Sequence, residues 1–283
     1  MHKNKNHIRA VPTKFVPRAV STAKANALRT KFDFVKTDVP GFDELFTDGI
    51  PRGSSVLVEG GPGSGKTVFC LQLAKNFCKQ GKKVLYMSFE EPEARLKVHM
   101  HSFGADPEEY EKKHLLYIKR FNALDIARSV EALLSEAKKE LLVEVQPVLI
   151  PKDFQPDYVL IDSLTSIGSA FSGEESRFRI YMEQLFRYLE GHNITSFLIR
   201  ETSAPSHIGT TFFEKGEAVS FLSDGIISLY NVFYRGKERK RAIEILKMRG
   251  AGFSRKVVEA EIIVNKGLIV YPNRILSGDY VLT

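Results

Sequence analysis

Residues 55–67 decide the fold, and they read Ser-Val-Leu-Val-Glu-Gly-Gly-Pro-Gly-Ser-Gly-Lys-Thr. An apolar run typical of a buried strand leads into a glycine-rich loop, and a helical pattern follows from about Gly65 to Gln80. The loop matches G-x-x-x-x-G-K-[ST], in which successive backbone N–H groups and the positive end of the next helix surround phosphate oxygens. A chance glycine-rich turn would need neither that strand nor that helix, so the sequence predicts a phosphate-binding loop.

Individual residues of this loop have predicted roles. Lys66 reaches the terminal phosphates, and the Thr67 hydroxyl ligates Mg²⁺. An apolar strand expected at 157–162 ends in Asp162, and an acid at the carboxyl end of a buried strand can hold Mg²⁺ through its water shell. The alternative is that Asp162 caps the following turn. The metal residues are then Thr67 and Asp162, and the nucleotide-binding residues are Gly60, Gly61, Pro62, Gly63, Ser64, Gly65, Lys66, Thr67 and Val68.

Two adjacent acids end the next apolar strand, which is expected at residues 84–89 and near the first strand. Neighbouring side chains at a strand end point in different directions, so one of Glu90 and Glu91 can face the terminal phosphate while the other orients it. A carboxylate there can align or deprotonate an attacking water. The alternative is a pair of solvated acids before a helix that begins near Pro92.

Apolar strands alternate with helical patterns over the first 200 residues, as in a mainly parallel sheet with helices on both faces. A helix is expected at 123–142, and a proline-bearing insertion follows it at 143–156. Strands then follow one another near 225–230, 242–247, 257–264 and 268–270, and we expect them to extend one edge of the sheet. The predicted fold class is α/β, with a mostly parallel twisted sheet and antiparallel strands toward the C-terminus.

The chain carries a formal net charge of +7, and its distribution is uneven. Residues 1–36 hold nine Lys or Arg and one acid, so they contribute +8 and residues 37–283 contribute −1. A uniformly basic body is therefore excluded. We divide the chain into a basic, flexible arm at 1–35 and a single domain at 36–283. The arm is either a weakly ordered terminus or a segment that binds an acidic partner.

Several classes of protein are disfavoured by composition. No apolar run reaches the roughly 18 residues of a membrane span, and the N-terminal segment lacks the apolar core of a secretory signal. The two cysteines, Cys70 and Cys78, fall on one predicted helix, where a disulfide is geometrically unfavourable. We expect no membrane partner and a cytoplasmic location, with both cysteines as core residues.

Four stretches together resemble the KaiC-like branch of the RecA-type P-loop ATPases, in particular single-domain archaeal members. They are TDVPGFDELFTDGIPRGSSVLVEGGPGSGKT at 37–67, VLYMSFEEPEARL at 84–96, YVLIDSLTS at 158–166 and ILKMRG at 245–250. The phosphate loop alone is shared by many NTPases. The proline-glycine lead-in, the paired glutamates and K-[LM]-R-G are more specific, and the resemblance covers residues 36 to about 265.

The resemblance implies a RecA-like fold and a homohexameric ring with ATP bound between subunits, which makes ATP and Mg²⁺ the expected cofactors. It implies that Glu90 and Glu91 are the catalytic pair and that Lys247 and Arg249 reach the neighbouring subunit's γ-phosphate. The alternate spacing of these two cations suits a solvated strand face equally well. The expected function is an ATP-binding, ATP-hydrolysing regulatory ATPase that signals its nucleotide state to a protein partner.

A second function to consider is a protein kinase that acts on itself or on a partner. Clock proteins of this family autophosphorylate a Ser-Thr pair just before the strand that leads to K-M-R-G. Here the corresponding positions are Ser220 and Phe221, and Phe253 stands where the family often has a histidine. Clock-type autokinase activity is therefore disfavoured, and Ser220 and Ser223 are the residues to examine for phosphorylation.

A third function is that of a nucleic-acid-associated ATPase like RecA and RadA. In recombinases the loop after the strand equivalent to 194–199 contacts DNA. Here residues 200–225 hold two basic and four acidic side chains, the wrong sign for binding phosphates. Residues 235–256 carry +7 and are either a solvated hairpin or a polyanion patch. The basic arm and residues 235–256 are thus the candidate nucleic-acid contacts, and a protein partner is favoured.

Overall fold

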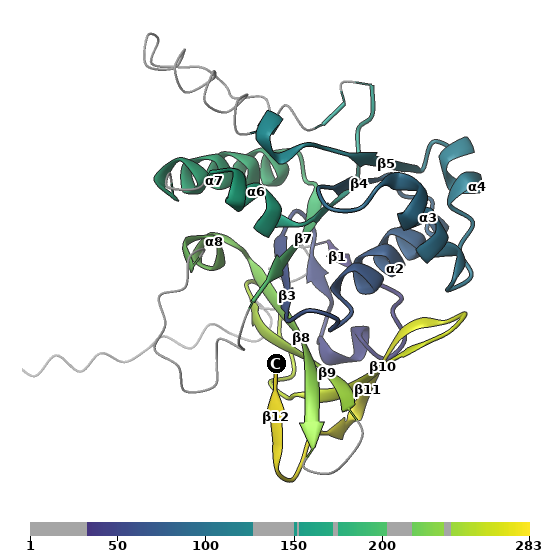
Figure 1. Cartoon of the computed structure of the whole chain (residues 1–283), viewed down its shortest axis with the longest axis vertical. Coiled ribbons are helices and arrows are strands. Elements are labelled where there is room, and N and C mark those ends of the chain that lie inside the picture. The colour runs from purple at the N-terminus through teal and green to yellow at the C-terminus, as the bar shows by residue number, and fades with distance from the viewer. Residues whose placement is uncertain (1–32, 127–149, 152, 172–174, 203–216, 235–238) are drawn as a thin grey trace, which may run out of the picture. The chain divides into compact units, whose positions relative to one another are not determined.

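The computed structural model describes residues 33–126, 150–151, 153–171, 175–202, 217–234 and 239–283. These residues form a ten-stranded mixed sheet whose main path runs β11-β10-β9-β8-β3-β7-β6-β4-β5 (Figure 1), with β12 paired to β8. The strands are β3 (Ser55–Gly60), β4 (Val84–Ser88), β5 (Leu116–Arg120), β6 (Tyr158–Asp162), β7 (Thr195–Glu201), β8 (Gly225–Tyr234), β9 (Arg239–Met248), β10 (Val258–Ile263), β11 (Gly267–Ile275) and β12 (Tyr280–Leu282).

The type of strand pairing changes once along this path, at β8. From β8 to β5 every neighbouring pair is parallel, which requires crossover connections. From β8 to β11 every pair is antiparallel, and so is the β12–β8 pair. The predicted parallel sheet with antiparallel strands at one edge is therefore confirmed.

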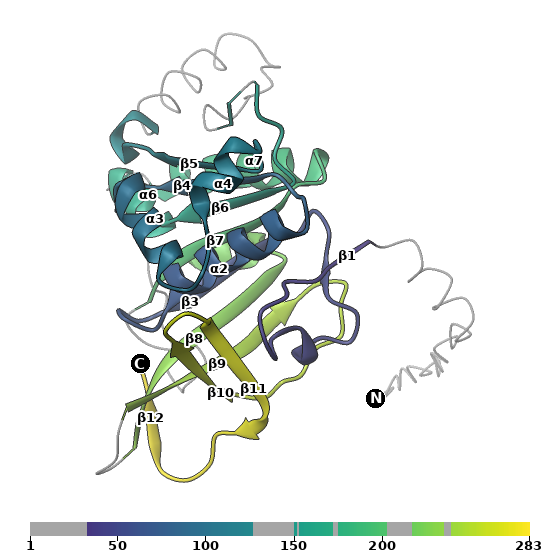
Figure 2. The ribbon, with the colours of Figure 1, turned by 90° about the vertical axis from the view of Figure 1, so that its right-hand side faces the viewer.

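Helices cover both faces of the sheet, as predicted (Figure 1). The first layer holds α2 (Lys66–Lys79), α3 (Glu93–His101) and α4 (Pro107–Lys112), and it shares one buried apolar cluster with the sheet. The second layer holds α6 (Leu164–Ala170), α7 (Glu175–Gly191) and α8 (Glu217–Leu222), and it shares another. Figure 2 shows the strands running between these layers.

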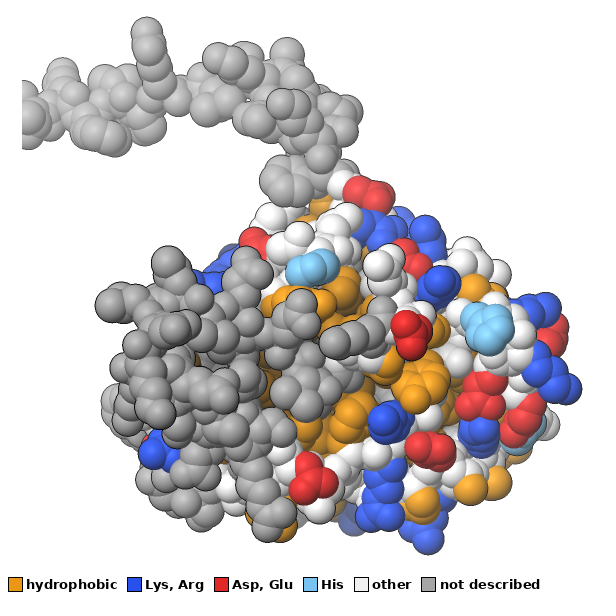
Figure 3. Space-filling view, turned by 90° about the horizontal axis from the view of Figure 1, so that it is seen from above, with side chains coloured by type: hydrophobic (Ala, Val, Ile, Leu, Met, Phe, Trp, Pro, Cys, Tyr) orange, Lys and Arg blue, Asp and Glu red, His pale blue; other side chains and the backbone are white. Residues whose placement is uncertain are grey.

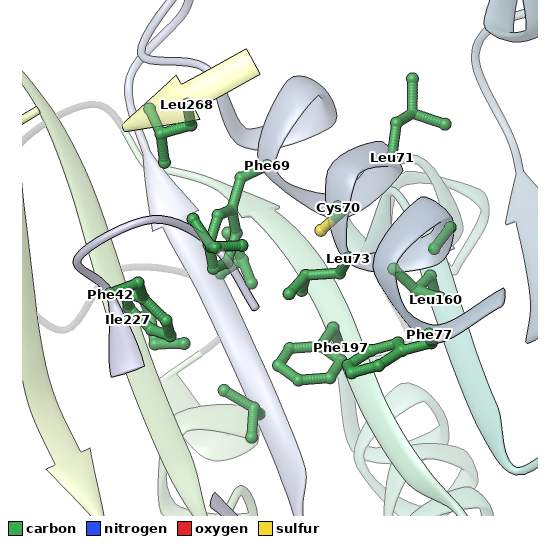
Figure 4. Packing of buried hydrophobic residues seen from close by; sticks show 14 of the residues in the cluster. Phe42, Phe69, Cys70, Leu71, Leu73, Phe77, Leu160, Phe197, Ile227 and Leu268 are labelled. Carbon is green, nitrogen blue, oxygen red and sulfur yellow. The ribbon is translucent and has the colours of Figure 1, made fainter. Parts of the chain in front are cut away.

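Helix α2 is held on the sheet by an apolar stripe at helical spacing. Phe69, Leu73 and Phe77 are fully buried and point toward the strands (Figure 4), and the Phe77 ring stacks on Tyr158 with ring centroids 3.7 Å apart. Each such side chain contributes roughly 2–3 kcal/mol of burial free energy. Because α2 cannot shift without losing these contacts, the loop at its N-terminus has a fixed position.

The lead-in segment, residues 34–51, packs against α2. Strand β1 (Phe34–Val35) pairs with β2 (Ile50–Pro51), and between them lies a single 3₁₀ turn, η1 (Asp43–Leu45), where the sequence predicts a short amphipathic helix. Asp43 ties the segment together by accepting hydrogen bonds from the Thr37 backbone N–H (3.0 Å) and hydroxyl (2.8 Å). Phe42 packs edge-on against Phe69 of α2.

Gly41 of the lead-in offers a stability test. Its φ is +74°, and a Cβ there would lie 2.0 Å from the main-chain oxygen of Val270. We expect Gly41→Ala to lower the free energy of unfolding by about 3 kcal/mol or more, because a backbone clash cannot be relieved by a rotamer change. Gly81→Ala is the control, since Gly81 has the same φ and open space around it. Equal melting temperatures for the two variants would contradict this account.

Most predicted elements agree with the structure, and two differences stand out. The strand expected at 84–89 near β3 forms β4, but β7 and β6 lie between β3 and β4. Helices α4, α6 and α8 and strand β12 were not predicted. The helix expected at 123–142 is described only at residues 123–126, and most of the insertion at 143–156 lies outside the described residues.

Two further expectations concern the cysteines and the membrane. Cys70 and Cys78 are both buried free thiols, as predicted. Among the described residues no helix is both long and apolar enough to cross a bilayer. The basic arm at 1–35 falls almost entirely outside the described residues, so its role stays a prediction.

Candidate nucleotide-binding site

The predicted phosphate loop connects β3 directly to α2, at the carboxyl end of the parallel strands. Gly65 is the N-cap of α2 and has a φ of +107°, which only glycine adopts without strain. The first-turn N–H groups of α2 therefore open toward the loop, as anion binding requires. The Ser64 hydroxyl is buried and has no hydrogen-bond partner among the described residues, so it is free to donate to a phosphate oxygen.

Lys66 lies inside this loop. Its side chain is only 7% exposed, and its ammonium group donates hydrogen bonds of 2.9 Å to the carbonyl oxygens of Gly60 and Gly61. Burial lowers the pKa of Lys66, while the nearby carboxylates of Glu201, Asp162 and Glu90 act in the opposite direction. A buried cation among three acids marks the place where a polyphosphate and a divalent metal would together balance the charge.

The two predicted metal residues are in direct contact. The Thr67 hydroxyl donates a 3.0 Å hydrogen bond to Asp162 Oδ2, and the Tyr86 hydroxyl donates one of 2.9 Å to the same oxygen. Burial raises the pKa of Asp162 to about 6, the two hydrogen bonds act against burial, and the charges of Glu90 and Glu91 raise the pKa further. This hydroxyl and carboxylate are the hard oxygen ligands that Mg²⁺ prefers, so the residues fit the metal.

The two acids after β4 point apart, as the sequence suggests. Glu90 Oε1 accepts hydrogen bonds from the Ser163 hydroxyl and, at 2.9 Å, from the Ser166 hydroxyl at the start of α6. Glu91 turns toward α3, where Arg95 Nε and His99 Nδ1 each lie 3.9 Å from its Oε2. Of the pair, Glu90 is the acid whose charge raises the pKa of Lys66, together with the charges of Glu201 and Asp162.

Lys247 and Arg249 lie at the opposite end of the sheet. The Arg249 backbone N–H donates to the Asp224 carbonyl oxygen, and the Asp224 N–H donates to that of Ser55. Arg249 is therefore level with Ser55, the first residue of β3. The phosphate loop begins at Gly60, the last residue of β3. Five residues of strand separate these levels by roughly 16 Å. Neither cation therefore belongs to the phosphate site of its own chain.

Both cations bind carbonyl groups at the C-terminus of α8. Lys247 Nζ donates to the carbonyl oxygens of Ser220 (2.9 Å) and Ser223 (2.5 Å), and Arg249 Nη2 donates to that of Phe221 (2.9 Å). Cations at a helix C-terminus are favourable there, because its last carbonyls are unpaired. The alternative considered for these residues was a solvated strand face, and on that face both side chains bind the end of α8.

Three contributions to this site were not identified from the sequence. Tyr86 binds Asp162, Ser166 joins Ser163 in holding Glu90, and Glu201 lies beside Gly60 in the β3–β7 register. A tyrosine inside an otherwise apolar strand is a usable signal for Tyr86. Glu201 carried none, because its position depends on β7 being the neighbour of β3.

The fold and the site define a P-loop ATPase of the RecA-like class. A family model for the KaiC ATPases matches residues 35–275. A UPF0273 protein of Pyrococcus horikoshii is 32% identical over 88% of this chain and 98% of its own length, and one from Aeropyrum pernix is 32% identical over 86% and 96%. The chain therefore belongs to the KaiC family of ATPases.

Two further comparisons agree with this assignment. The circadian clock oscillator protein KaiC of Thermostichus vulcanus is 30% identical over 82% of this chain, which spans 41% of that longer protein. The crystal structure of a KaiC-like protein from Pyrococcus horikoshii OT3 superposes with a TM-score of 0.66 and 30% identity, covering 85% of this chain and all of the other.

Proposed function

We propose that this protein binds and hydrolyses ATP with Mg²⁺ and works as a regulatory ATPase. The observation that carries the proposal is the contact of Thr67 with Asp162 beside a buried Lys66, with Glu90 held toward the same place. These groups supply the parts of a phosphoryl-transfer site: a cradle for the phosphates, ligands for a divalent metal, and a carboxylate for the attacking water.

Each residue then has a defined task. The loop amides and Lys66 bind the β- and γ-phosphates and keep them aligned. Thr67 and Asp162 hold Mg²⁺, which when bound neutralises charge on the phosphate oxygens. Glu90 orients a water for attack and takes its proton, while Ser163 and Ser166 fix the rotamer of Glu90.

The active form in this proposal is a ring, a homohexamer by resemblance to the family, in which each site lies at a subunit interface. The position of Lys247 and Arg249 supports it, because Arg249 lies level with the start of β3 and the Lys247 ammonium binds the carbonyl oxygens of Ser220 and Ser223, so both lie outside their own chain's site. Supplied by a neighbour, an arginine and a lysine stabilise the negative charge that develops on the transferred phosphoryl group.

The cross-subunit role predicts the behaviour of Arg249→Ala. We expect ATP hydrolysis by the assembled protein to fall by about 10³-fold, as for other arginines supplied in trans, while oligomer mass is unchanged. Phosphate release and light-scattering mass are measured together. Arg274→Ala is the control, since Arg274 is equally exposed (56% against 57%) and lies on β11.

Mixing experiments sharpen this test. Subunits with Lys66→Ala keep Arg249 but lack a working site, and Arg249→Ala subunits have the reverse defect. Mixed rings should therefore regain hydrolysis that neither variant shows alone. No recovery in rings proven to be mixed, or equal hydrolysis by a strictly monomeric sample, would contradict a role in trans.

The output in this proposal is a change of ring state that a protein partner detects. The two other functions are less well supported by the described residues. The Ser223 hydroxyl is fully buried and donates to the Ser220 carbonyl, which makes it a poor phosphate acceptor. Of the described basic residues in 239–256, Lys240 pairs with Glu259. On a different face of the molecule, shown in Figure 3, basic and acidic side chains are interspersed.

One assay separates these functions. ATP labelled at the γ-phosphate is incubated with the protein, with and without single-stranded DNA, and both free phosphate and labelled protein are counted. We expect phosphate release that DNA does not stimulate and no label on the chain. Label on Ser220, or stimulation by DNA, would favour the kinase or the nucleic-acid function instead.

A further inference from the structure

The phosphate loop lies against the antiparallel strands that follow the catalytic core in the sequence. A Cβ on Gly60 would lie 2.1 Å from the carbonyl oxygen of Leu229 on β8, and one on Gly65 would lie 2.8 Å from the Ile262 side chain on β10. Arg241 of β9 reaches the carbonyl oxygen of Gly63 at 3.4 Å. The outer side of the loop is therefore formed by residues that do not belong to the P-loop motif.

Strand β12 meets the loop end-on. The first half of β8 pairs with β3, and the residues of β8 from Val232 onward pair with β12 in the opposite direction. The end of β12 thus points at the end of β3 (Figure 2), and the phosphate loop starts between them. The carbonyl carbon of Thr283 would lie only 3.2 Å from a Cβ on Gly61.

Asn231 joins β12 to the loop. Its backbone exchanges two hydrogen bonds with Thr283, of 2.9 and 3.0 Å, and its side-chain amide donates a 3.1 Å hydrogen bond to the carbonyl oxygen of Pro62. The residue is 5% exposed, so this amide has few other partners available. The buried Asn231 side chain therefore holds Pro62, at the tip of the phosphate loop, at a position that depends on β12.

We propose that Asn231 and β12 are positioning elements of the nucleotide site, which hold the phosphate loop in its binding shape and couple nucleotide affinity to the docking of β12. This inference rests on the proposed binding of ATP at the loop. A preformed loop binds phosphate without first losing conformational entropy, so releasing its tip weakens affinity. Strand β12 is short, pairs only with β8 among the described strands, and exposes 63% of Val281, which makes its undocking inexpensive.

Coupling of this kind is reciprocal. If a docked β12 strengthens ATP binding, bound ATP must strengthen the docking of β12 by the same factor. A residue that merely stabilises the fold would show no such dependence, since ATP does not touch β12 in this account. The docking of β12, a strand outside the phosphate-loop motif, would thereby depend on whether ATP is bound.

The first test compares two buried asparagines. Asn231→Ala should weaken ATP binding about fivefold, the value of one hydrogen bond, and leave kcat at saturating ATP within about twofold. Asn76→Ala is the control, because Asn76 is 8% exposed and likewise donates to a main-chain carbonyl (3.0 Å), but near the far end of α2. Equal dissociation constants for the two variants, at matched loss of melting temperature, would overturn the proposal.

The second test compares neighbours on β12. Leu282 is 5% exposed and belongs to a small apolar cluster with Tyr230 and Val232, whereas Val281 faces solvent. Leu282→Ala should release β12 and weaken ATP binding, and Val281→Ala should change neither. Combining Leu282→Ala with Asn231→Ala should weaken binding by less than the product of the single effects, because both release the same loop.

The third test uses the unaltered chain. Saturation with ATP and Mg²⁺ should slow hydrogen exchange at residues 280–283 by about fivefold, matching the change in affinity. Unchanged exchange there, in a protein that demonstrably binds ATP, would overturn the coupling. Failure of the unaltered chain to bind ATP in the same titration would instead refute the proposed function, so the two failures are distinguishable.

Discussion

Lys66→Ala is expected to abolish ATP binding while leaving the fold intact. The ammonium group is the one buried cation described inside the loop, and it is held between the carbonyl oxygens of Gly60 and Gly61, where it faces the position of the terminal phosphates. Removing it leaves the carboxylates of Asp162, Glu90 and Glu201 uncompensated beside an incoming polyanion. We expect affinity to fall by at least about 10²-fold, the scale of a charge-assisted contact plus that repulsion.

The matched control is Lys75→Ala on the same helix. Lys75 is also buried (9% exposed) and donates a 2.8 Å hydrogen bond to the carbonyl oxygen of Phe103, but it lies two and a half turns away from the loop. Fluorescent-nucleotide titration gives the affinities, and circular dichroism reports the fold of both variants. Retained ATP binding by Lys66→Ala would contradict the assignment of the phosphate site.

Joint replacement of Glu90 and Glu91 by Gln is expected to stop turnover with little loss of ATP binding. Glutamine keeps the shape and the hydrogen bonds from Ser163 and Ser166, but it cannot accept a proton from water. General-base catalysis contributes about 10²–10⁴-fold, so steady-state phosphate release should fall by that factor. ATP affinity should not weaken, because two negative charges near the phosphates are removed.

The single variants separate the two acids. Glu90 acts on Lys66 and lies beside Ser163, whereas Glu91 faces Arg95 and His99. Glu90→Gln should therefore cause most of the fall in phosphate release, and Glu91→Gln should cause a smaller fall. Glu93→Gln is the control, as Glu93 is the next acid along the chain and accepts a hydrogen bond from the Arg120 N–H. Full turnover by the double variant would show that neither acid is catalytic.

The parts of this site that sequence predicts are those built from local spacing. The loop and its helix are contiguous from Gly60 to Val68, so their mutual geometry follows from the motif. Asp162 could be placed because a polar residue after an apolar run marks a strand end, and strand ends of a parallel sheet share one edge.

The order of the strands could not be read in the same way. Periodicity shows that 84–88 is a strand, but not that β7 and β6 separate it from β3. The contact of Tyr86 with Asp162 and that of Asn231 with Pro62 join residues 76 and 169 positions apart. Such contacts depend on long-range register, which leaves no local pattern. The hydrogen bonds of Lys247 and Arg249 to carbonyl oxygens at the end of α8 likewise leave no local pattern in the sequence.

The separation of Arg249 from its own phosphate loop restricts how copies of this chain can associate. If Arg249 acts on a neighbour's site, as proposed, a two-fold dimer satisfies both copies only in an antiparallel arrangement, in which each donor meets the other copy's acceptor. Head-to-tail contact instead repeats one donor–acceptor pairing, and it leaves one unmatched donor and one unmatched acceptor in any open chain of subunits. In either arrangement every site is complete only when the assembly is closed.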